Sequence, residues 1–327
     1  MNRLLLCACI ALVLSGCGGD STTPAVPQKD HLTLVLDWTP NTNHSGIYLA
    51  KARGLYAAAN LDVRIIEPGE QGGLPQLAAG NADFAITDSE SLIPARARGN
   101  DVVSVAAILQ HNTSSLVVPA DRGVKHPRDL AGKVYGGYGG ELEHALLDRL
   151  IGCDGGDSKR LKYVEIGETD YFTGFAKRQF DAAWIFDGWE GIRLKQAGST
   201  LTRFPFHPSC VPDWYTPILA TRDRVVATRP EIVRRFVTAT AQGYEIARRD
   251  PVAAAKALVA AVPELDQPLV AESAAYLAPL YADRGRPWGL QDAAVWQRFA
   301  TFLGRAGIVK QVPRASTLFT NRFLPTS

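Results

Sequence analysis

A regular alternation of short apolar runs with helix-like stretches limits the possible folds of this chain more than any other pattern in it. The runs LTLVL, LDVRII and ADFAIT have the length and composition of buried strands, and each is followed by a segment with helical spacing of apolar residues. Strands and helices that alternate in this way form α/β domains with a largely parallel sheet. We therefore expect an α/β protein built from mainly parallel sheets flanked by helices.

The alternation is interrupted near residues 115–133 and then resumes with a second set of strand and helix patterns. The run YTPILAT then has the composition of a strand that carries the chain back, and the remainder is helical in pattern. We expect one lobe from residues 31–118 and 216–327 and a second lobe from residues 119–215. Two crossings between the lobes make a hinge, and a ligand is expected between the lobes at the carboxyl ends of the strands.

Residues 1–17, MNRLLLCACIALVLSGC, have the form of a secretory signal, with a basic residue, an apolar stretch and small residues. The ending LSGC resembles the bacterial lipobox, so Cys17 is the expected lipid anchor. The alternative is an ordinary signal peptide with an incidental cysteine. Residues 18–30 are polar and rich in Gly, Pro and Thr, which is typical of a flexible tether. These segments predict an extracytoplasmic protein that is lipid-anchored to the cell membrane.

Two cysteines, Cys153 and Cys210, lie beyond this N-terminal region. They can pair in an oxidising compartment or remain two unrelated thiols, and their spacing suggests no metal site. The formal net charge is +2, and the chain has no basic block of the kind that nucleic acid requires. We expect a monomer that binds no nucleic acid, no metal and no cofactor.

The segment DWTPNTNH follows the first predicted strand and combines ring, amide and imidazole groups. Trp38 offers a flat apolar face, and Asn41 and His44 can each donate and accept hydrogen bonds. This mixture suits a flat, nitrogen-rich ring. Each residue also has a structural interpretation, because an asparagine or serine here can cap the coming helix and a tryptophan can belong to the core.

Further candidates follow the later predicted strands. In TDSES, one of Asp88 and Ser89 can cap the next helix while the other faces the ligand. In FDGWEG, Glu190 can accept hydrogen bonds from an amino group and a ring nitrogen, although the helix dipole also favours a carboxylate there. The remaining candidates are rings that could cover the ligand and a glycine that lets the backbone approach it: Trp189, Tyr215, Tyr138 and Gly137.

Catalytic residues are not indicated by any spacing in the chain. No histidine has a recognisable triad context, and lysine and arginine are not concentrated in the predicted binding loops. The pattern favours a neutral or weakly basic ligand over a phosphorylated one, and a binding protein over an enzyme.

Several segments, taken in order, resemble the pyrimidine-precursor-binding proteins of ABC importers in the NMT1/THI5-like group: DWTPNTNHSGIYLAKARGLY, ADFAITDSES, HNTSSLVV, YGGYGG and DAAWIFDGWEG. The resemblance implies the two-lobed periplasmic-binding-protein fold of type II. It also implies a receptor that delivers a thiamin precursor, a formylaminopyrimidine, to a permease powered by an ATPase subunit. Other members of the group resemble riboflavin receptors, so riboflavin is the main rival ligand.

The same group includes fungal enzymes that make the phosphorylated thiamin pyrimidine with pyridoxal phosphate and iron. His44 matches their reactive histidine, which makes a pyrimidine synthase the alternative function. The enzymes have a lysine that holds pyridoxal phosphate where this chain has Thr87, and a run of cysteines where it has Cys210 alone. These departures favour transport, with His44 as a ligand contact or a residue of the helix start.

Overall fold

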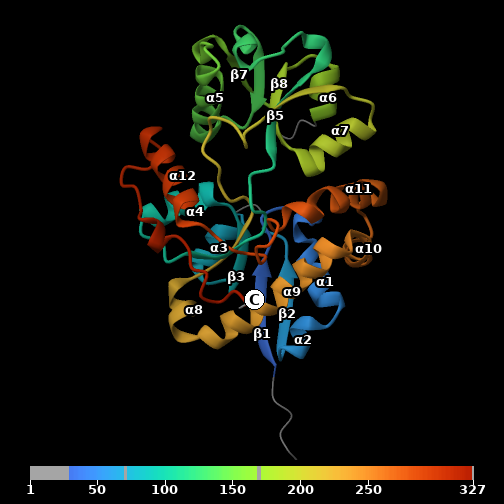
Figure 1. The fold of residues 1–327 in the computed structure, drawn as a ribbon, viewed down its shortest axis with the longest axis vertical. Coiled ribbons are helices and arrows are strands. Elements are labelled where there is room, and N and C mark those ends of the chain that lie inside the picture. The colour runs from blue at the N-terminus through green and yellow to red at the C-terminus, as the bar shows by residue number, and fades with distance from the viewer. Residues whose placement is uncertain (1–28, 70–71, 168–170, 326–327) are drawn as a thin grey trace, which may run out of the picture.

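Two five-stranded sheets, one in each lobe, form the framework of the protein (Figure 1). The computed structural model describes residues 29–69, 72–167 and 171–325. The expected signal segment, Cys17 and nearly all of the expected tether lie outside these residues. Within the described ranges, no helix has both the length and the apolar character needed to cross a membrane.

The sheet of lobe 1 has the strand order β2-β1-β3-β10-β4. β1 (Asp30–Val35) is parallel to β2 (Leu61–Ile66) and to β3 (Phe84–Thr87). β10 (Ile218–Thr221), which returns from the other lobe, is antiparallel to β3 and to β4 (Val103–Ala107). The sheet is therefore mainly parallel, as expected, with the returning strand reversed. The strands β3, β10 and β4 are buried at every position because helices cover both faces.

The sheet of lobe 2 has the order β7-β6-β8-β5-β9. β6 (Val134–Gly137) is parallel to β7 (Lys162–Glu165) and β8 (Ala182–Phe186), whereas β5 (Ser114–Pro119) is antiparallel to β8 and to β9 (Leu201–Pro205). The whole of β5 thus belongs to lobe 2, which corrects the lobe boundary expected at residue 118. Only strand pairing reveals this, because β4 and β5 are similar apolar runs separated by a short loop.

Helices flank both sheets. In lobe 1 they are α1 (Ser45–Ala52), α2 (Leu55–Ala58), α3 (Gly73–Ala79), α4 (Ser89–Ala97), α8 (Asp223–Thr228), α9 (Pro230–Arg249), α10 (Pro251–Ala261), α11 (Gln267–Leu277) and α12 (Ala293–Arg305). In lobe 2 they are α5 (Glu141–Cys153), α6 (Tyr171–Ala176) and α7 (Ile192–Gln196). Two sheets flanked by helices confirm the expected α/β class.

Helix α1 packs unusually close to α9. A Cβ atom on Gly46 of α1 would lie 2.3 Å from the ring of Tyr244, and one on Gly243 of α9 would lie 2.1 Å from the Gly46 carbonyl oxygen. Only glycine allows the two backbones to approach so closely. The Tyr244 hydroxyl also donates to the Asn43 carbonyl at 2.6 Å. Helix α9 therefore holds the start of α1 and the turn that precedes it.

Two crossings, residues 108–113 and 206–217, connect the lobes. They lie side by side, since the Ile108 amide donates to the Pro217 carbonyl at 3.0 Å. Backbone segments that run together between two rigid lobes form a hinge. The predicted two-lobed architecture is therefore confirmed.

A disulfide joins Cys153, the last residue of α5, to Cys210 in the second crossing. The Arg149 side chain on α5 also donates to the Cys210 carbonyl at 3.0 Å. The second crossing is thus tied to lobe 2.

Candidate ligand-binding site between the lobes

The carboxyl ends of the central strands in both sheets lie at the edges that face the crossings. The chain leaves lobe 1 at the end of β4, which shares its direction with β1 and β3. In lobe 2 the first residue of β5, Ser114, pairs with Phe186, the last residue of β8. Figure 1 shows β1 pointing toward the other lobe. The loops after β1, β3, β6 and β8 therefore meet between the lobes, where ligands of open α/β sheets bind.

Trp38 is exposed to solvent on the loop after β1. Its side chain is 64% exposed, although tryptophan is usually a largely buried residue. An exposed indole at a sheet edge can stack on a flat ligand without first breaking contacts in the core. Trp38 is therefore free to act as predicted.

The turn that presents Trp38 is held by Asn41 and His44. The backbone amide of Asn41 donates to Nδ1 of His44 at 3.2 Å, and Nε2 of His44 lies 2.7 Å from Oδ1 of Asp37. The side chain of Asn41 accepts from the Asn43 amide at 2.9 Å and donates to the Thr39 carbonyl at 3.0 Å. Both residues are buried. Both nitrogens of the fully buried His44 are used within the turn, which corrects the expectation that it contacts the ligand directly, whereas the expected ligand contact of Asn41 stays a prediction.

The loop after β3 brings two carboxyl groups to the same edge. Asp88 accepts from the Ser91 amide at 2.6 Å and so caps α4. Burial raises the pKa of the Asp88 carboxyl to about 6. Burial, and then the charge of Asp88, raise the pKa of Glu90 well above its usual range. Lobe 1 therefore presents two carboxyl groups in the loop after β3.

Two buried polar atoms in this loop, Oγ of Ser89 and Oε2 of Glu90, have no hydrogen-bond partner among the described residues. Buried polar atoms are normally paired, so Oγ of Ser89 is suited to a ligand contact, whereas the Glu90 carboxyl also interacts with Asp88 and with the buried Trp214. Ser89 was predicted from the sequence, whereas Glu90 was not. The signal for Glu90 was present in the same TDSES segment, one residue further into the helix.

The glycine-rich loop after β6 is braced by the buried Glu143 carboxylate. It accepts from the Tyr135 hydroxyl and the Tyr138 amide, both at 2.9 Å, and from the Gly140 amide at 3.2 Å. A Cβ atom on Gly137 would lie 2.4 Å from the Tyr135 ring. Gly137 is thus required by internal packing, and its expected role in ligand approach stays a prediction.

Tyr138 and Glu190 lie together on the lobe 2 edge. The Tyr138 side chain is 62% exposed. Burial first, and then Tyr138 and Glu190 among its neighbours, raise the pKa of Tyr171. The Phe186 amide donates to Oε2 of Glu190 at 3.1 Å, and burial raises the pKa of this carboxyl. Lobe 2 thus carries an exposed ring and a carboxyl group in the loops after β6 and β8, as lobe 1 carries Trp38 and Glu90 in the loops after β1 and β3.

The turn η5 (Asp187–Gly191) after β8 contacts lobe 1 directly. The Ser273 hydroxyl of α11 donates to the Gly188 carbonyl and lies 2.5 Å from Oγ1 of Thr42. A Cβ atom on Gly188 would lie 2.9 Å from the Leu277 side chain. The Gly188 backbone in lobe 2 therefore touches side chains of α11 in lobe 1 on this side of the hinge.

Trp189 belongs to the same interlobe contact. Its ring packs against a hydrophobic cluster on α10 and α11 that includes Leu258 and Val270. Next to it, Lys195 lies 2.8 Å from Glu272. This corrects the expectation that Trp189 covers a ligand ring, because in this structure it covers the other lobe.

Tyr215 lies inside lobe 1 rather than between the lobes. Its side chain is nearly fully buried, and its hydroxyl accepts from the Asp292 amide at 2.8 Å. Its ring lies beside that of Trp296. The expectation that Tyr215 contacts the ligand is therefore corrected: the crossing turns into the core at this point.

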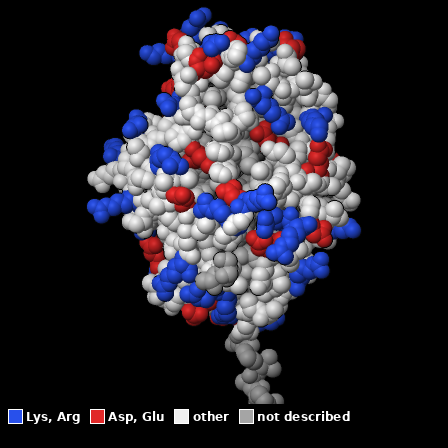
Figure 2. Space-filling view, in the orientation of Figure 1, with Lys and Arg blue, Asp and Glu red and all other residues white. Residues whose placement is uncertain are grey.

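A groove of about 1360 Å³ separates the lobes on another side, between α5 and α12. Its lining contains none of the predicted binding residues: Glu141, His144, Ala145, Asp148, Arg149, Pro212, Ala294, Gln297, Arg298, Thr301, Phe302, Arg305, Ala306 and Gly307. Over the face drawn in Figure 2, basic and acidic side chains are interspersed on both lobes.

Comparison with known proteins gives a consistent family. The family model described as NMT1/THI5 like matches residues 41–254. The chain is 26% identical to the formylaminopyrimidine-binding protein of Halalkalibacterium halodurans, over 88% of this chain and 89% of that protein. It is 24% identical to the 4-amino-5-hydroxymethyl-2-methylpyrimidine phosphate synthase of Legionella pneumophila, over 91% and 93% of the two chains. It is 26% identical to the riboflavin-binding protein RibY of Chloroflexus aurantiacus, over 99% and 98%.

Solved structures agree on the fold. The periplasmic aliphatic sulphonate binding protein SsuA of Escherichia coli superposes with a TM-score of 0.66 at 18% identity, over 88% of this chain and 91% of SsuA. At this identity the likeness concerns the fold alone.

Proposed function

Because the chain belongs to the NMT1/THI5-like family, we propose that it is the solute-binding receptor of an ABC importer and binds a thiamin pyrimidine precursor between its lobes. The name and coverage of the Halalkalibacterium halodurans relative support this ligand class. The permease and ATPase subunits are its partners, and the chain acts as a monomer without a cofactor.

The observation that carries the proposal is the pair of exposed rings at facing sheet edges. Trp38 is 64% exposed on lobe 1 and Tyr138 is 62% exposed on lobe 2. Rings exposed to this extent on braced turns are suited to hold a flat ligand from both sides. A pyrimidine with an exocyclic amino group suits the site, because its face can stack on the rings and its amino group can donate hydrogen bonds to the Glu190 carboxyl group.

The edge of the ligand is recognised by a carboxyl group on one lobe and a hydroxyl group on the other. Glu190 accepts from the pyrimidine amino group on lobe 2, and Ser89, whose buried Oγ has no partner among the described residues, contacts the ligand on lobe 1. A hydrogen bond to a carboxylate in a desolvated site is stronger than one in water. A ligand that contacts both lobes favours the closed arrangement, which a permease can distinguish from the open one.

The interlobe contact between η5 and α11 supplies the closing surface. Its hydrogen bond from Ser273 to Gly188 and the packing of Trp189 form only when the lobes approach on that side. Ligand binding and this contact therefore stabilise the same state.

The receptor acts outside the cytoplasm and is attached to the membrane through lipid on Cys17. The LSGC segment supports the anchor. The disulfide between Cys153 and Cys210 supports an oxidising compartment.

Calorimetry of the purified chain with formylaminopyrimidine and with riboflavin tests the proposal. We expect tight binding of the pyrimidine and a loss of about 1–3 kcal/mol of binding free energy in Glu190→Gln, because the amide replaces a charged acceptor. Val252→Ala is the matched control, because Val252 is exposed on α10 outside the proposed site. Tight riboflavin binding with no pyrimidine binding would replace the ligand while leaving the receptor class in place.

A pyrimidine synthase is the second candidate function, because the Legionella pneumophila relative carries that name. The donor chemistry does not fit pyridoxal phosphate at the position that resembles the enzymes, since the buried Thr87 has no amine to form a Schiff base. Formation of new pyrimidine during incubation with pyridoxal phosphate and iron would establish the enzyme and exclude the receptor as the sole function.

A further inference from the structure

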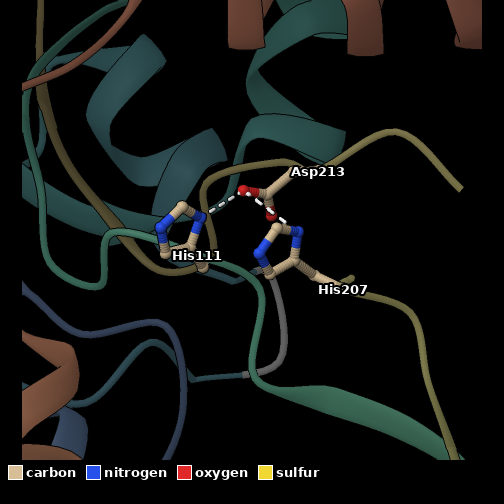
Figure 3. A group of neighbouring side chains, drawn as sticks. All are labelled: His111, His207 and Asp213. Atoms are coloured by element: carbon tan, nitrogen blue, oxygen red, sulfur yellow. Dashed lines mark hydrogen bonds and ion pairs between the residues drawn. The ribbon is translucent and has the colours of Figure 1, made fainter. Parts of the chain in front are cut away.

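The hinge contains a compact cluster of two histidines and an aspartate (Figure 3). His111 lies in the first crossing, and His207 and Asp213 lie in the second. Nδ1 of His111 is 2.6 Å from Oδ2 of Asp213, and Nδ1 of His207 is 3.6 Å from the same oxygen. The ligand atoms of all three residues lie within 4.8 Å of one another. The cluster therefore links the two crossings of the hinge through side chains.

Asp213 is held in position by the backbone around it. Its Oδ1 accepts from the amides of Asn112 and Trp214, each at 3.0 Å, so Oδ2 is left to face the two imidazoles. The side chain is only 10% exposed. A carboxylate oriented by hydrogen bonds to its second oxygen is a common feature of metal sites, because it fixes the ligand before the ion arrives.

A second carboxylate supports His111 from its other side. Nε2 of His111 lies 3.3 Å from Oδ1 of Asp283, which follows α11 in lobe 1. A histidine whose far nitrogen faces a carboxylate has a fixed ring orientation and a more basic ligand nitrogen. The arrangement around His111 therefore matches the carboxylate–histidine–metal pattern.

We propose that His111, His207 and Asp213 form a binding site for a divalent cation of the zinc type, which clamps the two crossings of the hinge. Two imidazoles and one carboxylate suit zinc and similar ions, whereas magnesium and calcium prefer oxygen ligands throughout. Three protein ligands leave one position of a tetrahedral ion for water.

Loading the site requires a small rotation. The two imidazole rings are stacked, with centroids 4.4 Å apart and planes within 1° of parallel. An ion bound by both rings lies in both ring planes, so the rings cannot remain parallel. Bonds of about 2.0–2.1 Å also place tetrahedral donors about 3.3 Å apart. The side chain of His207 is 31% exposed and that of Asp213 is 10% exposed, so the histidine turns while the aspartate stays in place.

A bound ion would couple the two crossings, because its ligands come from both. The lobes rotate about these crossings when they open, so the ion would restrict the range of interlobe angles. This inference does not depend on which organic ligand the protein binds.

The test uses the mature chain without an affinity tag, freed of metal by a chelator and titrated with Zn²⁺ alone by calorimetry. We expect one zinc ion per chain, and at least a tenfold loss of affinity in His207→Ala and in Asp213→Asn. Asp283→Asn, which removes only the support of His111, is expected to weaken binding by about 10–100-fold. Zinc-edge X-ray absorption should show nitrogen and oxygen ligands that include two imidazoles.

His31→Ala is the matched control, because His31 also pairs with a carboxylate, Asp62 at 2.9 Å, but is exposed. It should bind zinc as the parent does. Each variant is first checked for unchanged melting without zinc, and His207→Ala, which truncates a partly exposed ring, decides the result if Asp213→Asn unfolds. Absence of zinc binding, or equal binding in His207→Ala, overturns the site. Small-angle scattering that shows the same interlobe distribution with and without bound zinc overturns the clamp.

Discussion

Trp38 in lobe 1 and Tyr138 in lobe 2 are exposed to almost the same extent, yet opposite chemistry holds their turns. The loop of Trp38 is fixed by the imidazole of His44, whose two nitrogens bond to Asn41 and Asp37. The loop of Tyr138 is fixed by the Glu143 carboxylate, which gathers three donors. The comparison teaches that an exposed ring becomes a defined binding surface only when a buried polar residue fixes the backbone beneath it.

The largest expected effect on stability comes from removing Glu143, the carboxylate that holds the loop after β6 in lobe 2. Glu143→Ala leaves a buried hydroxyl and two amides without their acceptor, so we expect a loss of about 2–4 kcal/mol in the free energy of unfolding. Urea denaturation measures it. Glu141→Ala is the control, because Glu141 is exposed in the first turn of the same helix. Equal losses in the two variants would show that Glu143 does not act as a brace.

Removing His44 from the loop after β1 in lobe 1 should reduce stability somewhat less, because the side chain of Asn41 also makes hydrogen bonds within that loop. His44→Ala removes the acceptor of the Asn41 amide and a partner of Asp37, and should cost about 1–3 kcal/mol. Thermal melting measures the change, with His31→Ala, an exposed histidine, as the control. If His44→Ala were as stable as the control, His44 would not fix the loop of Trp38 as Glu143 fixes the loop of Tyr138.

The two carboxyl groups in the loop after β3 of lobe 1 predict a pH dependence that sharpens the contrast further. Burial raises the pKa of Asp88 to about 6 from an ordinary value of 3.8. Between these values the unfolded chain has lost the proton that the folded chain keeps, so the contribution of Asp88 to stability falls as pH rises from about 4 to 6 and then levels off. Glu90, whose pKa is also raised, acts in the same direction.

Asp88→Asn keeps the cap of α4, because the amide oxygen can still accept from Ser91, but removes the titrating group. The fall in stability over this pH range should shrink by about 1–3 kcal/mol in the variant, because the full shift of the Asp88 pKa corresponds to about 3 kcal/mol. Denaturation at several pH values measures the slope, and a slope equal to that of the parent would contradict the assignment.

The smallest expected effect on stability is at the rings themselves. Trp38→Ala and Tyr138→Ala should each change the free energy of unfolding by less than about 0.5 kcal/mol, because exposed side chains lose few contacts. Each should weaken pyrimidine binding by about 0.5–1.5 kcal/mol, the value of an aromatic stacking contact. Calorimetry and melting on the same samples separate the two. Loss of stability without loss of affinity would make the rings structural.

Much of the fold could be predicted because the strands carry a strong local signal. The run LTLVL became β1 (Asp30–Val35), and the buried run ADFAIT contains β3 (Phe84–Thr87). The return of the chain at β10 was also expected from its composition. The error at β5 arose because nothing local distinguishes a strand of lobe 1 from a strand of lobe 2.

The candidate site was predictable in place but not in detail. The segments that follow β1, β3, β6 and β8 were identified, because loops at the carboxyl ends of strands commonly carry binding residues. These segments do not show which of their polar atoms remain available to a ligand. His44 uses both ring nitrogens within one turn, Tyr215 is buried, and Trp189 packs on the other lobe.

The sequence by itself determined the α/β class and the loops that carry the candidate site, because strand and helix periodicity and strand-end composition are local properties. Which strands pair and which side chains contact one another was decided by the tertiary structure alone. It set which lobe each strand joins, which side chains brace a turn rather than reach a ligand, and that His111 meets His207 and Asp213. These contacts join residues far apart in the chain, and their energies depend on burial and distance, which no local pattern encodes.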